Sequence, residues 1–143
     1  MGLEEIYTEL IAEESRNPAH RHHLAHPTAV LKGRNPSCGD EITLEVEVKD
    51  GVIESAAFTG VGCAISQAST SLMIDLIEGQ PVEKAERLTA LFLSMIKGEI
   101  EDDAALEELE DAAALKSIAN LPARVKCAVL SWRTLDEVLH EGK

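Results

Sequence analysis

The sequence has few aromatic residues, few cysteines and no long hydrophobic run. Aromatic residues make up 3% of the 143 residues, whereas 45% are hydrophobic, so a folded core must consist mainly of aliphatic side chains. No apolar run approaches the roughly 18 residues of a membrane-spanning helix, so we expect no transmembrane helix. This length favours a single compact domain covering residues 1–143.

Basic residues are also scarce. The chain has 13 Lys and Arg against 26 Asp and Glu, which gives a formal net charge of −13. This charge argues against a nucleic-acid backbone or an anionic membrane as a partner. The first residues, Met1–Glu5, lack the basic and apolar stretches of a signal peptide, so we expect a cytoplasmic location.

The three cysteines are widely separated and form no CxxC pair. Their odd number and spacing indicate reactive thiols or metal ligands in a reducing compartment rather than a disulfide framework. Cys38 is followed by Gly39 and Asp40, while Gly60 and Gly62 precede Cys63 and allow close approach of the backbone. Three thiolates and the Asp40 carboxylate form a four-donor set that suits zinc or the open edge of an iron–sulfur cluster.

Alternating apolar and polar residues predict an antiparallel hairpin. Residues 41–49 alternate strictly, Asp50-Gly51 is a strong turn signal, and residues 52–59 return as the partner strand. Residues 28–32 predict a further short strand. Apolar periodicity, glycine and proline predict helices at 3–15, 64–78, 81–97 and 112–119, and from Pro122 onward.

The predicted helices also define the surroundings of two cysteines. Cys63 precedes a helix start, where the helix dipole favours a thiolate. Cys127 lies in the early turns of the last helix, with Arg124 and Lys126 near it to offset negative charge. Taken alone, Cys127 is equally compatible with an ordinary buried core residue.

A histidine cluster is a rival metal site. Its members are His20, His22, His23 and His26. Prolines bracket the segment and no carboxylate supports it as in HExxH motifs, so we interpret it as a solvated loop. The acidic segment 98–111 lacks the spacing of a calcium loop and is interpreted as a solvated surface.

Three motifs resemble the IscU/SufU (NifU N-terminal-like) family of iron–sulfur cluster assembly proteins. They are Asn35–Asp40, Gly60–Ser66 and Pro122–Ala128, and the resemblance covers residues 27–139. Lys126 stands where IscU proteins carry a histidine, and residues 98–117 form an acidic insertion. Both features resemble the SufU branch. Residues 1–26, an N-terminal helix and the His-rich loop, depart from the family pattern at 14–18, so docking of a partner is expected to differ in detail there.

The resemblance implies an α+β fold, with helices packed on a three-stranded antiparallel sheet. It also implies zinc ligands Cys38, Asp40, Cys63 and Cys127, with Cys38 as sulfur acceptor and Arg124 as a supporting cation. The implied activity is sulfurtransferase-like: persulfide sulfur passes from a SufS-type, pyridoxal-phosphate-dependent cysteine desulfurase towards cluster assembly or apo iron–sulfur proteins.

Two alternative functions remain. One is a scaffold that assembles a [2Fe–2S] cluster, or binds iron, and transfers the cluster to apo-proteins. Lys126 counts against it, because an ammonium group has no lone pair for a metal. The other is a small binding module with a structural zinc, although an aspartate ligand is unusual in such sites.

Overall fold

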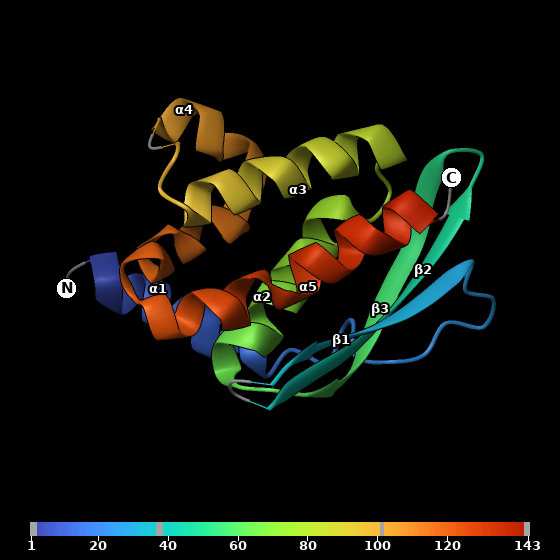
Figure 1. Cartoon of the computed structure of the whole chain (residues 1–143), viewed down its shortest axis with the longest axis horizontal. Coiled ribbons are helices and arrows are strands. Elements are labelled where there is room, and N and C mark those ends of the chain that lie inside the picture. Colours follow the sequence, from blue (N-terminus) through green and yellow to red (C-terminus); the bar gives the residue numbers. More distant parts are fainter. Residues whose placement is uncertain (1–2, 37–38, 101, 142–143) are drawn as a thin grey trace.

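The computed structural model describes residues 3–36, 39–100 and 102–141. Its elements are α1 (Leu3–Ser15), β1 (Ala29–Asn35), β2 (Asp40–Lys49), β3 (Val52–Val61), α2 (Ala64–Ile77), α3 (Val82–Ile96), α4 (Asp103–Leu106), the 3-10 helix η1 (Glu107–Asn120) and α5 (Pro122–Glu141). They form a single α+β domain with a three-stranded antiparallel sheet in the order β1-β2-β3, as the sequence predicts (Figure 1).

Strand β1 extends further at its C-terminal end than the predicted strand at 28–32. The hairpin turn is as predicted, and Asp50 and Gly51 both have positive φ, at 54° and 78°, as a type I′ turn requires. At the opposite end, β1 continues to Asn35, which pairs with Asp40. Asp40 is therefore the first residue of β2. Its backbone position is fixed by pairing between β1 and β2.

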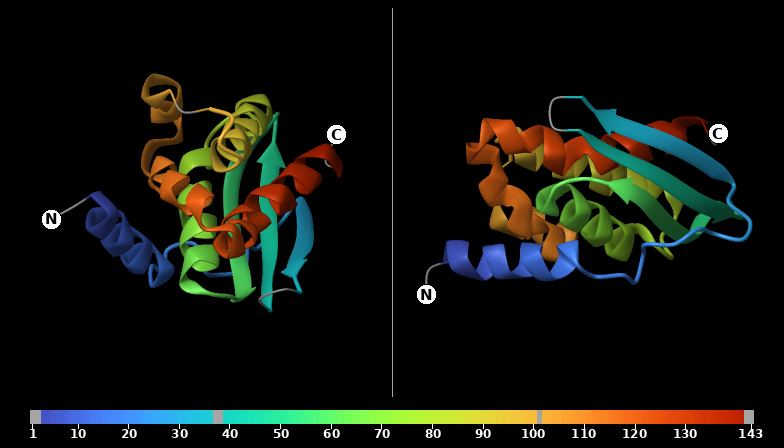
Figure 2. Two further views of the ribbon diagram at one scale, coloured as in Figure 1. Left: turned by 60° about the vertical axis from the view of Figure 1, so that its left-hand side comes forward. Right: turned by 90° about the horizontal axis from the view of Figure 1, so that it is seen from below.

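Helices cover one face of this sheet (Figures 1 and 2). The β2 residues on that face, Ile42, Leu44 and Val46, are fully buried. A Cβ atom on Gly33 would lie only 2.1 Å from Thr134 Oγ1, so the missing side chain lets α5 pack closely on β1. This contact helps to position α5 on the sheet. None of the described helices combines the length and apolarity needed to cross a membrane.

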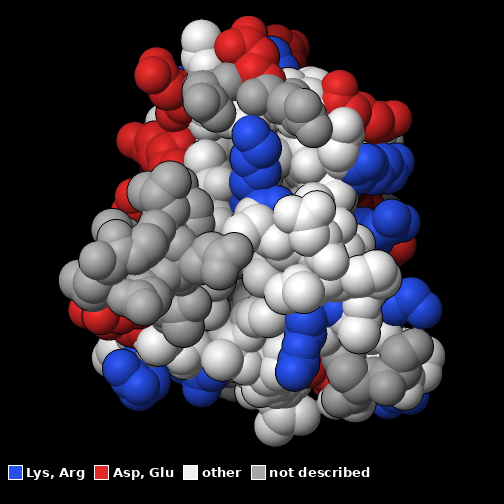
Figure 3. Space-filling model, turned by 90° about the vertical axis from the view of Figure 1, so that its left-hand side faces the viewer, with Lys and Arg blue, Asp and Glu red and all other residues white. Residues whose placement is uncertain are grey.

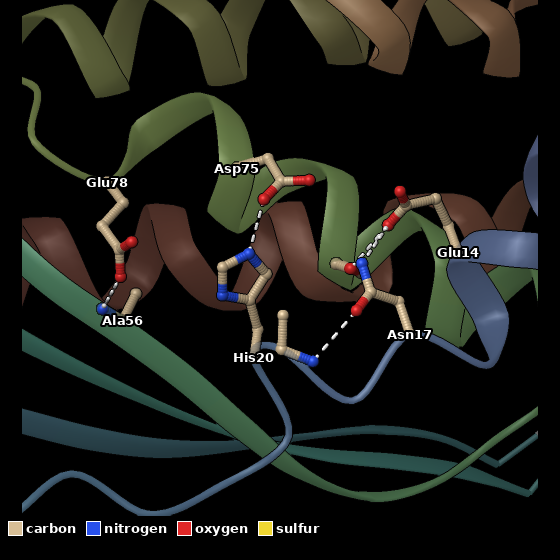
Figure 4. Close-up of polar contacts among 8 residues, drawn as sticks. Glu14, Asn17, His20, Ala56, Asp75 and Glu78 are labelled. Atoms are coloured by element: carbon tan, nitrogen blue, oxygen red, sulfur yellow. Dashed lines mark hydrogen bonds and ion pairs between the residues drawn. The ribbon is translucent and has the colours of Figure 1, made fainter.

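The His-rich segment is a largely exposed loop, as predicted, and His22, His23 and His26 are exposed, but it also makes ordered contacts with the sheet and α2. The His20 carbonyl accepts a hydrogen bond from Phe58 N on the open edge of β3, at 2.9 Å. The His20 ring contacts Asp75 of α2 at 2.5 Å (Figure 4), and the His23 ring contacts the buried Glu45. The segment therefore protects a strand edge, and no metal-ligand group is found within it in the described chain.

The acidic insertion contributes to the core as well as to the surface. Its acidic side chains are exposed where described, as expected, and Figure 3 shows Asp and Glu gathered towards the end of the molecule that carries α4. However, helical structure begins at Asp103 rather than 112, and Leu106, Leu109 and Leu115 are buried. Burial of these leucines explains why a strongly acidic segment folds onto α3 instead of remaining solvated.

Candidate metal centre

Three segments that are distant in sequence converge at one end of the sheet. Asp40 begins β2, Cys63 immediately precedes α2, and Cys127 lies in the second turn of α5. The Asp40 carboxylate and the sulfur atoms of Cys63 and Cys127 provide ligand atoms that all lie within 4.8 Å of one another. Asp40 and Cys127 are each only 1% exposed, whereas Cys63 is partly exposed. The site is thus a largely buried group with one more accessible thiol.

The two oxygens of Asp40 have different surroundings. Oδ1 accepts a hydrogen bond from the backbone N–H of Cys63 at 2.9 Å. Oδ2 lies 3.9 Å from Cys63 Sγ. Cys63 is the N-cap residue of α2 and its own side chain makes no capping hydrogen bond. The carboxylate therefore both satisfies the start of a helix and faces the thiols.

This donor set fits a tetrahedral metal ion. Zinc binds carboxylate oxygen at about 2.0–2.2 Å and thiolate sulfur at about 2.3 Å, so neighbouring ligand atoms stand about 3.5 Å apart. The 3.9 Å between Asp40 Oδ2 and Cys63 Sγ is close to that separation. Two thiols and one carboxylate leave one tetrahedral position to be supplied by a further donor.

The other predicted site residues are not part of this buried group as the structure describes it. Cys38 falls outside the described residues. Arg124 is exposed in the first turn of α5, where its N–H donates to the Leu121 carbonyl at 2.8 Å. Its guanidinium makes no ion pair with a described residue, and Lys126 is also exposed. Both predicted cations therefore lie on the outer surface of the helix that carries Cys127.

Sequence reasoning missed a groove beside the site. It has a volume of about 620 Å³ and lies between the end of β1 and the first turns of α5. Its lining includes three cationic and several apolar side chains: Arg34, Lys126 and Arg133, with Pro122, Val125, Val129 and Leu130. Arg34 comes from a strand far away in sequence, so no local pattern indicates this concentration of positive charge in an acidic protein.

Comparisons with known proteins agree with this architecture. The NifU-like N terminal domain family matches residues 6–141. The iron–sulfur cluster assembly scaffold protein IscU of Thermotoga maritima is 42% identical over 139 residues, covering 97% of this chain and 96% of the relative. The zinc-dependent sulfurtransferase SufU of Bacillus subtilis is 36% identical over 136 residues, covering 95% of this chain and 90% of the relative.

Solved structures give the same result. A crystal structure described as an iron–sulfur cluster assembly scaffold protein for the SUF system, from Fervidobacterium islandicum, superposes with a TM-score of 0.85. Its sequence is 35% identical, and the match covers 96% of this chain and 99% of that one. The chain therefore belongs to the NifU-like N-terminal domain family, the IscU/SufU family of iron–sulfur cluster assembly proteins.

Proposed function

We propose that this protein is a zinc-dependent sulfurtransferase of iron–sulfur cluster biogenesis, which accepts sulfur from a cysteine desulfurase. The observation that carries the proposal is the convergence of Asp40, Cys63 and Cys127 within 4.8 Å at one end of the sheet. The name of the Bacillus subtilis relative, a zinc-dependent sulfurtransferase, supports this choice within the family.

The proposed zinc ligands are Cys38, Asp40, Cys63 and Cys127. Bound zinc would hold the thiols deprotonated without redox chemistry of its own. The Cys63 amide holds Oδ1 of Asp40, which would leave Oδ2 to bind the ion, and Cys127 is buried away from water. Zinc bound at this site would protect Cys38 from oxidation between encounters with the desulfurase.

Sulfur transfer needs no external oxidant or reductant. The Cys38 thiolate attacks the terminal sulfur of a persulfide on the desulfurase, and a new S–S bond forms on Cys38. The old S–S bond breaks, and its electron pair leaves on the thiolate of the desulfurase. The terminal sulfur, with any proton it carries, moves to Cys38, so atoms and electrons balance.

The surface beside the site supports docking of a protein partner. Arg34, Lys126 and Arg133 lie along the groove next to Cys127, and Arg124 is exposed near them. These cations favour an acidic region on the partner. The proposed partner is a SufS-type, pyridoxal-phosphate-dependent desulfurase, and Arg124 is the proposed supporting cation during the exchange.

An assay of desulfurase turnover tests the proposal. The zinc-loaded protein is mixed with a SufS-type desulfurase and cysteine, and alanine release is followed with and without added reductant. We expect strong stimulation that is lost in Cys38→Ala, with Ser131→Ala as a buried control variant outside the donor set. Equal stimulation by wild type and Cys38→Ala would overturn the role of Cys38 as acceptor.

The second candidate is a scaffold for a [2Fe–2S] cluster. The 42% identity to a protein named as an assembly scaffold favours it. Thiolate and carboxylate donors also suit iron. Anaerobic reconstitution followed by transfer to an apo-ferredoxin separates the two functions, because a sulfurtransferase is not expected to deliver intact clusters.

A further inference from the structure

Ser66 carries a buried hydroxyl group that makes no hydrogen bond in the described structure. The residue is only 1% exposed, and its Oγ atom lacks a partner. Cys63 is the N-cap of α2, and Ser66 is the third residue of the helix. A hydroxyl can donate one hydrogen bond and accept others, so burying it without a partner costs free energy. Its presence next to a candidate ligand therefore needs an explanation.

The unpartnered hydroxyl follows from the way Asp40 caps α2. In a capping box, the side chain of the third helical residue accepts the backbone N–H of the N-cap residue. Here that N–H belongs to Cys63 and donates to Asp40 Oδ1 at 2.9 Å. Asp40 occupies the acceptor position that Ser66 would otherwise fill, so the serine hydroxyl remains available.

Gly62 shows how close this hydroxyl lies to the carboxylate. A Cβ atom on Gly62 would lie 3.0 Å from Asp40 Oδ1 and 3.1 Å from Ser66 Oγ. Both oxygens therefore face the same small space, which only a glycine leaves open.

We propose that Ser66 is a positioning residue of the metal site, whose hydroxyl donates a hydrogen bond to the Asp40 carboxylate when a metal ion is bound. This inference rests on the zinc site proposed above. With Oδ1 held by the Cys63 amide and the Ser66 hydroxyl, Oδ2 stays directed towards the thiols. Hydrogen bonds to a ligating carboxylate of this kind orient the ligand and raise metal affinity.

The test compares zinc affinity and metal-free stability in the full-length protein. Zinc affinity is measured by competition with a chromophoric chelator, and stability by urea unfolding of the metal-free protein. We expect Ser66→Ala to weaken zinc binding by about 10-fold, the lower end of the range for outer-shell partners. Its metal-free stability should stay unchanged or rise, because the substitution removes a buried group that had no partner.

Ser131 provides a matched control. It is also 1% exposed, its hydroxyl also lacks a partner, and it follows Cys127 by four residues, but no measured contact places it beside Asp40. Ser131→Ala should change zinc affinity by less than about twofold. An equal loss in both variants would overturn the proposal, since the effect would then belong to any buried hydroxyl near a cysteine.

A double-mutant cycle with Asp40→Ala shows whether Ser66 acts through the carboxylate. In the Asp40→Ala background, Ser66→Ala should have almost no further effect on zinc affinity. Additive losses of zinc affinity in the double variant would overturn the proposal. It would also be overturned if the wild-type protein bound zinc tightly and Ser66→Ala bound it equally well. If the wild-type protein bound no zinc, the proposed zinc-dependent function would fail, and this inference with it.

Discussion

The backbone amide of Cys63 donates to Asp40 Oδ1 across 2.9 Å, so the first residue of β2 caps the helix that follows β3. This single contact links the position of a candidate metal ligand to the stability of a helix. Removing the oxygen acceptor of Asp40 should therefore lower the stability of the fold, whereas removing its negative charge should weaken metal binding.

We predict different effects for Asp40→Ala and Asp40→Asn. Asp40→Ala removes the capping acceptor and should lower the free energy of unfolding of the metal-free protein by about 1–2 kcal/mol. Asp40→Asn keeps an oxygen acceptor and should retain most of that stability, while zinc affinity falls because the negative charge is lost. Urea unfolding and chelator competition measure the two quantities. Equal destabilisation by both substitutions would contradict the capping role.

Replacing Glu110 by glycine should stabilise the protein, whereas glycine usually destabilises helical segments. Its backbone has φ 50° and ψ −130°, a conformation that favours glycine, within the otherwise helical η1. Glu110→Gly should therefore raise the free energy of unfolding by about 1 kcal/mol. The control Glu107→Gly, at an exposed residue in the same segment, should lower it by about 0.5–1 kcal/mol. The prediction would be refuted if both substitutions changed the free energy of unfolding in the same direction, as measured by thermal or urea unfolding.

Glu78 should stabilise the open edge of β3. Its Oε2 atom accepts a hydrogen bond from the buried backbone N–H of Ala56 at 3.1 Å (Figure 4). Glu78→Ala should lower the free energy of unfolding by about 1 kcal/mol because the N–H loses its acceptor. Glu78→Gln retains an oxygen and should recover most of this loss, and amide hydrogen exchange at Ala56 should accelerate only in the alanine variant.

Acid should weaken an ion pair on the outer side of β1 and β2. Lys32 lowers the pKa of Glu41 by hydrogen bonding and by its charge, and Arg34 adds to the effect. Because the folded-state pKa is lowered, the favourable interaction is present above the unfolded-state pKa of Glu41 and is lost as pH falls through its folded-state pKa.

Carboxyl-carbon NMR titration should place the Glu41 midpoint below that of the unfolded chain. In Lys32→Met that midpoint should move up towards the ordinary value. A midpoint unaffected by loss of Lys32 would show that the ion pair does not form in solution.

Much of the fold was predictable from local sequence patterns. Strict alternation over 41–49 and the Asp50-Gly51 pair predict the hairpin, because side-chain period and positive φ are local properties. Helices α1, α2, α3 and α5 are also predicted closely, since their apolar periodicity, prolines and glycines act over a few residues. The family motifs direct attention to Asp40, Cys63 and Cys127 for the same reason.

Local patterns failed where burial depends on distant partners. The acidic side chains around Leu106 and Leu109 suggest a solvated segment, yet these leucines pack into the core. The histidine segment has no local periodicity, and its order depends on Asp75, Glu45 and the edge of β3. Both outcomes depend on surfaces provided by other elements.

The sequence by itself determined the types of donor and the elements that carry them. Only the tertiary structure decided that Asp40 caps α2, that Ser66 is left with an unpartnered hydroxyl beside it, and that cations gather along the groove by α5. Donor chemistry is a property of each residue. Convergence instead depends on the packing of β2, α2 and α5, which local sequence does not encode.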